Sequence, residues 1–90
     1  MLFMVIENFR GRDAKPVYRR FRDSGRLMPD GIAYIASWVD AAHTRCFQVM
    51  ECADRTLLEQ WMANWNDLVD FEVVPVVTSA EARAAIEPLL

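Results

Sequence analysis

Three side chains in the middle of the sequence combine aromatic rings with a fixed positive charge. Tyr34 and Trp38 lie four residues apart, and Arg45 follows a short turn. A hairpin around this turn is predicted to place Trp38 opposite Arg45 and Tyr34 on the same face. Two amphipathic rings and a cation are groups that hold an aromatic or acidic small molecule in an otherwise apolar pocket. A cation–π pair of Trp38 and Arg45 that only stiffens the hairpin is the alternative interpretation.

His43, the only histidine, lies in the same turn and is the one candidate for catalytic acid–base chemistry. Histidine titrates near neutral pH, so at the mouth of a pocket it can accept or donate a proton. A solvated turn histidine without a catalytic role is the alternative, because turns are exposed and variable. Patterns for zinc ligands and phosphate-binding loops are absent. Whether the protein is an enzyme stays open, and we expect no metal and no cofactor.

Four strands and two amphipathic helices are predicted to position these side chains. Apolar patterning predicts strands at 2–9, 31–40, 44–52 and 71–77 and helices at 13–28 and 54–66. Asp13 and Asp54 are the expected N-caps of the helices. Thr78 and Glu81 form a capping-box pattern that opens a short C-terminal helix, which Pro88 ends.

This order of elements predicts one α+β domain over residues 1–90. A β-α-β-β-α-β order with an added C-terminal helix is that of a ferredoxin-like sandwich. Right-handed crossovers place both helices on the same face of an antiparallel sheet. The first and last strands are nevertheless apolar on both faces. We therefore expect a homodimer through the helix-free sheet face, giving a dimeric α/β barrel.

Two features of the helices admit both a structural and a ligand-binding interpretation. The spacing of Trp61 and Trp65 with neighbouring apolar residues favours a helix packed on the sheet over a ligand-stacking stripe. Gly25 is expected on the apolar side of the first helix, where it allows either close packing or space for a ligand.

Composition and charge exclude several classes of function. The 90 residues are 53% hydrophobic and carry a formal net charge of −3, while residues 10–26 hold seven Lys and Arg against two acids. The basic stripe of Lys15, Arg19, Arg22 and Arg26 is expected to be a solvated helix face, so we expect no nucleic-acid partner. No stretch approaches the ~20 apolar residues of a membrane span, and no signal peptide is evident. A cytoplasmic protein with two reduced cysteines, Cys46 and Cys52, is expected.

The segments MLFMVIENF, GRLMPDGIAYIASWVD, RCFQVMECAD and LVDFEVVPVVTSAEA resemble a family of bacterial domains of unknown function, DUF3303. The resemblance covers nearly the whole chain, and residues 36–40 and 71–79 are its most specific part. It implies the ferredoxin-like fold and the sheet-to-sheet dimer of the dimeric α/β-barrel group, and it brings no activity.

The resulting expectation is a small dimeric protein that binds a small apolar or aromatic/acidic metabolite in the barrel or the helix–sheet cleft. The alternatives are a cofactor-independent monooxygenase or isomerase-like enzyme and a structural dimerisation module. Fold alone does not decide among them.

Overall fold

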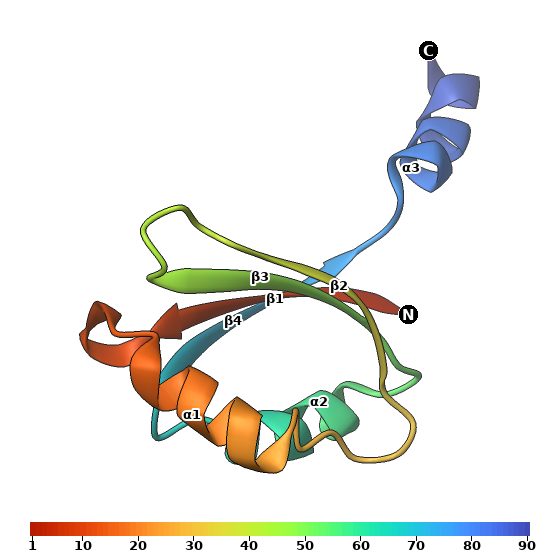
Figure 1. Ribbon diagram of the computed structural model, residues 1–90. Helices are drawn as coiled ribbons and strands as arrows, with labels where there is room; N and C mark the ends of the chain where they lie inside the picture. The colour runs from red at the N-terminus through yellow and green to blue at the C-terminus, as the bar shows by residue number, and fades with distance from the viewer.

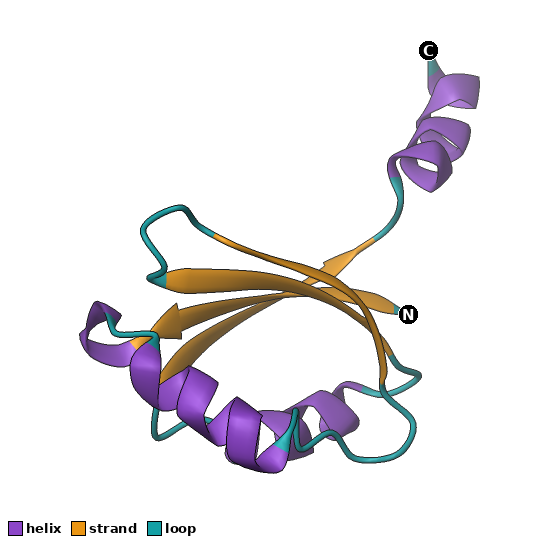
Figure 2. Cartoon of the chain, viewed as in Figure 1, coloured by secondary structure: helices purple, strands orange, loops and turns teal.

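A four-stranded antiparallel sheet forms the centre of the chain, and two helices pack on one of its faces (Figure 1, Figure 2). The computed structural model describes residues 1–90. The strands are β1 (Leu2–Phe9), β2 (Ala33–Val39), β3 (Arg45–Glu51) and β4 (Val69–Val76), in the spatial order β2-β3-β1-β4. The helices are α1 (Lys15–Ser24), α2 (Arg55–Ala63) and α3 (Ser79–Ile86), with 3-10 turns at Arg10–Arg12 and Glu87–Leu89. The predicted α+β class is confirmed, and the arrangement is compatible with a ferredoxin-like fold.

The core lies between the sheet and the helices α1 and α2. Side chains alternate along each strand, so that Phe3 and Val5 of β1 and Met50 of β3 all point toward the helices. Trp61 and Trp65 meet them from the helix layer and are 2% and 4% exposed. The structural interpretation of the two tryptophans as core residues is therefore confirmed.

Helix α1 is shorter than the sequence predicts because Gly25 ends it. The predicted helix ran over 13–28, whereas α1 covers Lys15–Ser24. Gly25 adopts a φ of 69°, and its N–H donates to the Phe21 carbonyl at 2.8 Å. Positive φ beyond the last turn is the usual role of glycine as a helix stop. A Cβ on Gly25 would stand in open space, so close packing does not explain this residue.

The predicted caps are present at α2 and α3, whereas at α1 the residue before the helix is Ala14 and Asp13 bonds to the first turn from one residue further out. Asp13 Oδ1 accepts a hydrogen bond from the Lys15 N–H at 3.0 Å, and Asp54 Oδ1 accepts one from the Thr56 N–H at 2.8 Å. Thr78 Oγ1 accepts from the N–H of residue 81 at 3.1 Å. Helix α2 ends at Ala63 rather than at the predicted residue 66. Local side-chain chemistry thus sets where the helices begin.

The predicted register of the hairpin is wrong by two residues, as the pairing of β2 with β3 shows. Trp38 lies opposite Phe47 instead of Arg45. The cause is a longer turn, in which the Asp40 carboxylate accepts hydrogen bonds from the Thr44 N–H and hydroxyl at 2.7 Å each. It also accepts one from the Arg45 N–H at 3.0 Å. Together these hydrogen bonds lower the pKa of Asp40 to about 2, and the bond from the Thr44 hydroxyl is the largest cause.

A bulge in β2 places Tyr34 on the opposite face of the sheet from the one that the sequence predicts. The register shifts between Tyr34 and Ala36, which leaves Ile35 without a partner. One extra residue reverses the face to which the preceding side chain points. Tyr34 therefore pairs with Met50 and turns to the helix side, whereas Trp38 stays on the opposite face.

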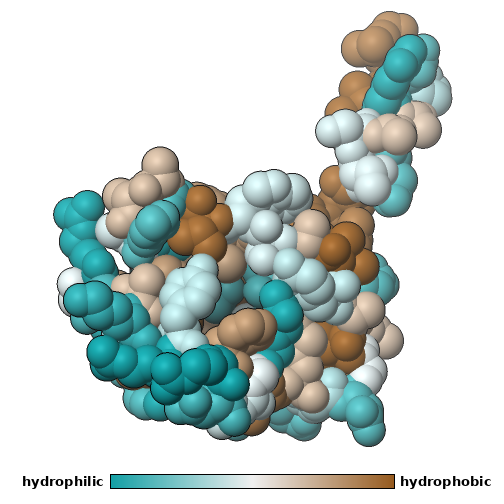
Figure 3. Space-filling view, viewed as in Figure 1, coloured by the Kyte–Doolittle hydropathy of each residue, from teal (hydrophilic) through white to brown (hydrophobic).

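The helix-free face of the sheet, here called the open face, carries apolar side chains that nothing in the chain covers. Its members include Met4, Ile6, Trp38, Phe47, Val49 and Val74. Trp38 is 59% exposed. Helix α3 lies on this side but projects past the end of the sheet, clear of the body (Figure 1, Figure 3). Its Ile86 and the following Leu89 are exposed. The single chain is an open sheet with one bare apolar face.

Candidate functional site

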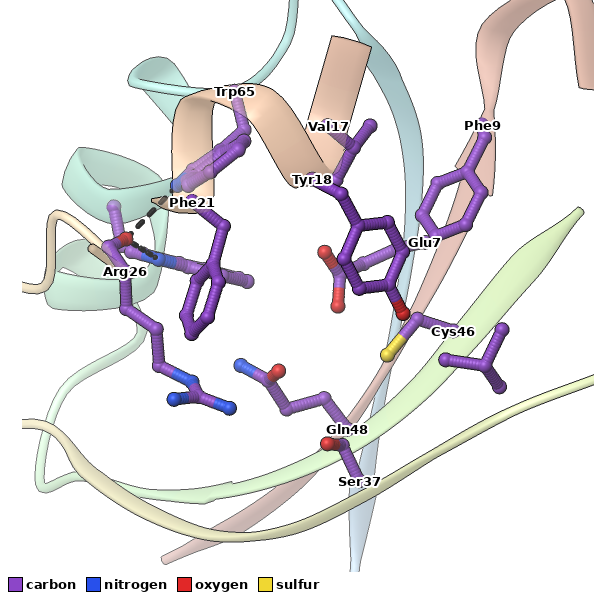
Figure 4. A pocket seen from close by; sticks show the side chains of 12 residues that line it. Glu7, Phe9, Val17, Tyr18, Phe21, Arg26, Ser37, Cys46, Gln48 and Trp65 are labelled. Atoms are coloured by element: carbon purple, nitrogen blue, oxygen red, sulfur yellow. Dashed lines mark hydrogen bonds between the residues drawn. The ribbon is translucent and has the colours of Figure 1, made fainter. Parts of the chain in front are cut away.

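A cavity of about 130 Å³ opens between α1, α2 and the sheet (Figure 4). Its apolar lining is Phe9, Val17, Phe21, Val39, Trp61 and Trp65. Its polar lining is Glu7, Tyr18, Arg26, Ser37, Cys46 and Gln48. An apolar cavity with a few convergent polar groups is the usual form of a small-molecule site.

Glu7 is the charged group at the centre of this cavity. It follows Phe3 and Val5 on the buried face of β1, is only 6% exposed, and points into the space below α1 (Figure 4). Burial raises the pKa of Glu7 to about 7, against a smaller lowering by the Cys46 thiol and the Arg26 charge. Among the neighbouring side-chain donors, the Cys46 thiol is the one whose hydrogen bonding lowers the pKa of this carboxyl. A buried carboxyl with so weak a partner retains capacity to bind a ligand.

Two further polar residues of β3 border the same carboxyl. Cys46 lies directly opposite Glu7, and burial together with the Glu7 charge raises the pKa of the thiol to about 12. Cys46 therefore stays a protonated thiol and is a poor nucleophile. Gln48 is 5% exposed and its amide Nε2 donates to the Met50 sulfur at 3.2 Å. Neither Cys46 nor Cys52 forms a disulfide, in line with the prediction.

Arg26 departs from the basic stripe to which the sequence assigns it. Lys15, Arg19 and Arg22 are exposed on α1, where Figure 3 shows hydrophilic side chains gathered. Because α1 stops at Ser24, the chain changes direction before Arg26 and sends its guanidinium toward the cavity (Figure 4). The prediction of a solvated stripe is confirmed for the three helical residues and wrong for Arg26.

The backbone and side chain of Arg26 are both held in place. The indole N–H groups of Trp61 and Trp65 each donate to the Arg26 carbonyl oxygen at 2.9 Å. The guanidinium carbon lies 3.8 Å from the ring centroid of Tyr34 and 5.1 Å from that of Phe21. Stacking on aromatic rings fixes the plane of a guanidinium while its N–H donors stay free. Arg26 is a positioned cation at the cavity wall.

The three residues that the sequence groups as a ligand site do not come together. Tyr34 lies on the helix side, where its hydroxyl is 2.6 Å from Ser37 Oγ, a group that lines the cavity. Trp38 and Arg45 lie on the open face, and Arg45 stacks 5.0 Å from the Phe47 ring rather than on Trp38. The expectation that Tyr34 shares a face with the other two is wrong. Only Tyr34 adjoins the cavity, through Arg26 and Ser37.

His43 lies outside this cavity. It is an exposed turn residue with a φ of 59°, and its N–H donates to the Asp40 carbonyl at 2.9 Å. It borders a separate surface hollow that also includes Lys15 and Tyr18. No group of three or more His, Cys, Asp or Glu side chains in residues 1–90 is arranged to hold a metal ion.

Sequence reasoning did not assign Glu7, Gln48 or Arg26 to a site, although two of them leave a signal. Glu7 and Gln48 each occupy a buried-face position between apolar residues of a central strand. A polar residue in such a position is costly unless it has a partner. The signal for Arg26 is weaker, because its direction depends on where α1 ends.

Comparison with known proteins finds one relationship. The family described as a domain of unknown function (DUF3303) matches residues 1–90. No curated protein and no solved structure matches the chain. None of the helices is both long enough and apolar enough to cross a membrane.

Proposed function

The chain belongs to the DUF3303 family, and we propose that it binds a small, single-ring molecule in the helix–sheet cavity. The observation that carries this proposal is Glu7, a carboxyl that is 6% exposed, faces the cavity and has only a thiol as partner. The Cys46 thiol is a weak hydrogen-bond donor, so a ligand hydroxyl or amino group is a stronger partner for the Glu7 carboxyl.

The size of the cavity limits the ligand. Its volume of about 130 Å³ is close to that of an engineered apolar cavity of about 150 Å³ that holds benzene. Pockets for larger, drug-sized ligands start at roughly 300 Å³. One ring with one or two small substituents therefore matches the space, and the aromatic walls suit a flat ligand.

Thermal-shift and calorimetric titrations with benzoate and phenol test this proposal. We expect binding to raise the Tm of the wild-type chain, since a ligand present at 100 times its Kd adds about 2.7 kcal/mol. The variant Val17→Phe fills the cavity and is expected to abolish the shift. Val77→Phe places the same side chain at an exposed position and serves as the control. A folded wild type that binds neither compound leaves the structural dimerisation module as the better proposal.

We also propose that two copies associate through the open face. The support is its run of uncovered apolar residues, with Trp38 59% exposed and Val74 39% exposed. Apolar patches of this kind on a sheet mark association sites. Sedimentation equilibrium is expected to give twice the 10.4 kDa chain mass. Trp38→Glu is expected to yield the monomer, whereas Arg22→Glu on the exposed side of α1 leaves the dimer intact. A monomeric wild type contradicts this proposal.

Proton transfer of the isomerase type is a second candidate function, favoured by the position of Glu7 and by its pKa of about 7. A carboxylate with that pKa can remove a proton from a carbon beside a ligand carbonyl and return it elsewhere. The electron pair moves to the carbonyl oxygen and back, so the reaction needs no cofactor. We expect the wild type to speed deuterium exchange at the methyl group of acetophenone and Glu7→Gln to lose this effect. Exchange that is unchanged by the wild type contradicts this function.

A further inference from the structure

We propose that the ligand of the helix–sheet cavity is an aromatic acid with a hydroxyl or amino substituent. Its carboxylate pairs with Arg26, and its substituent donates a hydrogen bond to Glu7. This inference rests on the proposed function, namely that the cavity holds a single-ring molecule.

The Glu7 end of the cavity selects a hydrogen-bond donor. An ionised carboxylate only accepts hydrogen bonds, and the chain supplies Glu7 with nothing stronger than the Cys46 thiol. Thiols are weak donors, so a ligand hydroxyl or amino group is the better partner. A second carboxylate at this end would instead face the negative charge of Glu7 inside a poorly hydrated space.

The Arg26 end selects an anion. Its guanidinium carbon lies 3.8 Å from the Tyr34 ring centroid, and none of the ion pairs of the chain within 4.0 Å includes Arg26. The Trp61 and Trp65 side chains donate to the backbone carbonyl of Arg26. These bonds do not use the N–H donors of the guanidinium, which remain available. A planar guanidinium with free donors matches the geometry of a carboxylate.

The two ends belong to one site. Arg26 and Glu7 line the same cavity, and the Arg26 charge lowers the pKa of Glu7 against the larger rise that burial causes. Their side chains enter the cavity from different elements, β1 and the loop after α1 (Figure 4). The aromatic walls, which include Phe21 and Trp61, border the space that both side chains enter. A ring with a donor and a carboxylate on separate positions satisfies both groups at once.

Isothermal titration calorimetry at pH 7.5 tests this assignment with four probes: benzoate, phenol, 3-hydroxybenzoate and 4-hydroxybenzoate. We expect one hydroxybenzoate isomer to bind the wild type at least about tenfold more tightly than benzoate, the factor that one hydrogen bond to a charged group supplies. Glu7→Leu is expected to remove this preference while benzoate still binds. Glu72→Leu is the control, because Glu72 lies on the open face of the neighbouring strand β4.

A second variant tests the other end without depending on the folding of Glu7→Leu. Arg26→Gln keeps the backbone carbonyl that Trp61 and Trp65 bind. It is expected to weaken benzoate and the hydroxybenzoates about tenfold or more and to leave phenol unchanged. Arg22→Gln, at an exposed position on α1, is the matched control.

The outcomes separate this inference from the proposed function. If no probe binds the wild type, the proposed function fails. If benzoate binds but neither hydroxyl improves its affinity, or the improvement persists in Glu7→Leu, the cavity binds rings and only this inference fails. An Arg26→Gln variant that binds benzoate as the wild type does also contradicts it.

Discussion

The two faces of the sheet use similar residues in different surroundings. On the helix side, Arg26 stacks on Tyr34 at 3.8 Å and Glu7 is 6% exposed. On the open face, Arg45 stacks on Phe47 at 5.0 Å while its side chain stays exposed. The open-face carboxylate Glu72 is exposed as well. The same residue types are therefore buried and held in a fixed geometry only where the helices exclude water.

The largest expected contrast concerns the tryptophans of the two faces. Trp61 is 2% exposed, so Trp61→Ala is expected to lower the free energy of unfolding by about 4 kcal/mol. Trp38 is 59% exposed, and Trp38→Ala is expected to cost the isolated chain less than about 1 kcal/mol. Urea unfolding at several protein concentrations measures both. A large, concentration-dependent loss for Trp38→Ala would show that a second copy buries the open face.

The next contrast concerns the carboxylates and depends on pH. The pKa of Glu7 is about 7 in the folded chain against an ordinary value of 4.5. Between these pH values the folded state holds a proton that the unfolded state has released. The free energy of unfolding therefore falls as pH rises from about 4.5 to 7 and stays lower above it.

Glu7→Gln removes this titration. It is expected to be more stable than the wild type above pH 7 by about 3 kcal/mol, and nearly equal to it at pH 4. Glu72→Gln on the open face is expected to leave the pH profile of the wild type intact. Equal pH profiles for Glu7→Gln and the wild type, measured by urea unfolding, would contradict the burial of an uncompensated carboxyl.

A smaller contrast concerns the helix caps on the two sides. Asp54→Ala removes the cap of α2, which packs on the core, and is expected to cost about 1 kcal/mol of global stability. Thr78→Ala removes the cap of α3, which stands clear of the body, so global unfolding of the isolated chain is expected to be unchanged. Equal losses at both caps would show that α3 is docked in solution.

The smallest contrast concerns the two stacked arginines. Arg26→Ala is expected to cost about 1 kcal/mol, because its guanidinium is held between two rings. Arg45→Ala is expected to cost less than about 0.5 kcal/mol, as is usual for an exposed side chain. Thermal unfolding of both variants at equal concentration measures the difference. A larger loss of stability for Arg45→Ala than for Arg26→Ala would show that the arginine on the open face contributes more to stability.

The sequence alone predicts the features that depend on neighbouring residues. The caps at Asp54 and Thr78, the buried stripe of Trp61 and Trp65 and the helices on one face are all confirmed. The caps and the buried stripe follow from hydrogen bonds and side-chain spacing within four residues, and the common face of the helices follows from the order of elements and right-handed crossovers.

The candidate site depends on the tertiary structure instead. The bulge at Ile35 decides that Tyr34 faces the helices, whereas Trp38 and Arg45 share the open face. The end of α1 at Gly25 decides that Arg26 reaches the cavity. A one-residue change in strand register reverses the direction of a side chain, and a one-residue change in helix length turns it by about 100°. Residue propensities do not fix such a change. Composition and spacing determined the fold class, whereas the packing of helices over Glu7 decided where the candidate cavity lies.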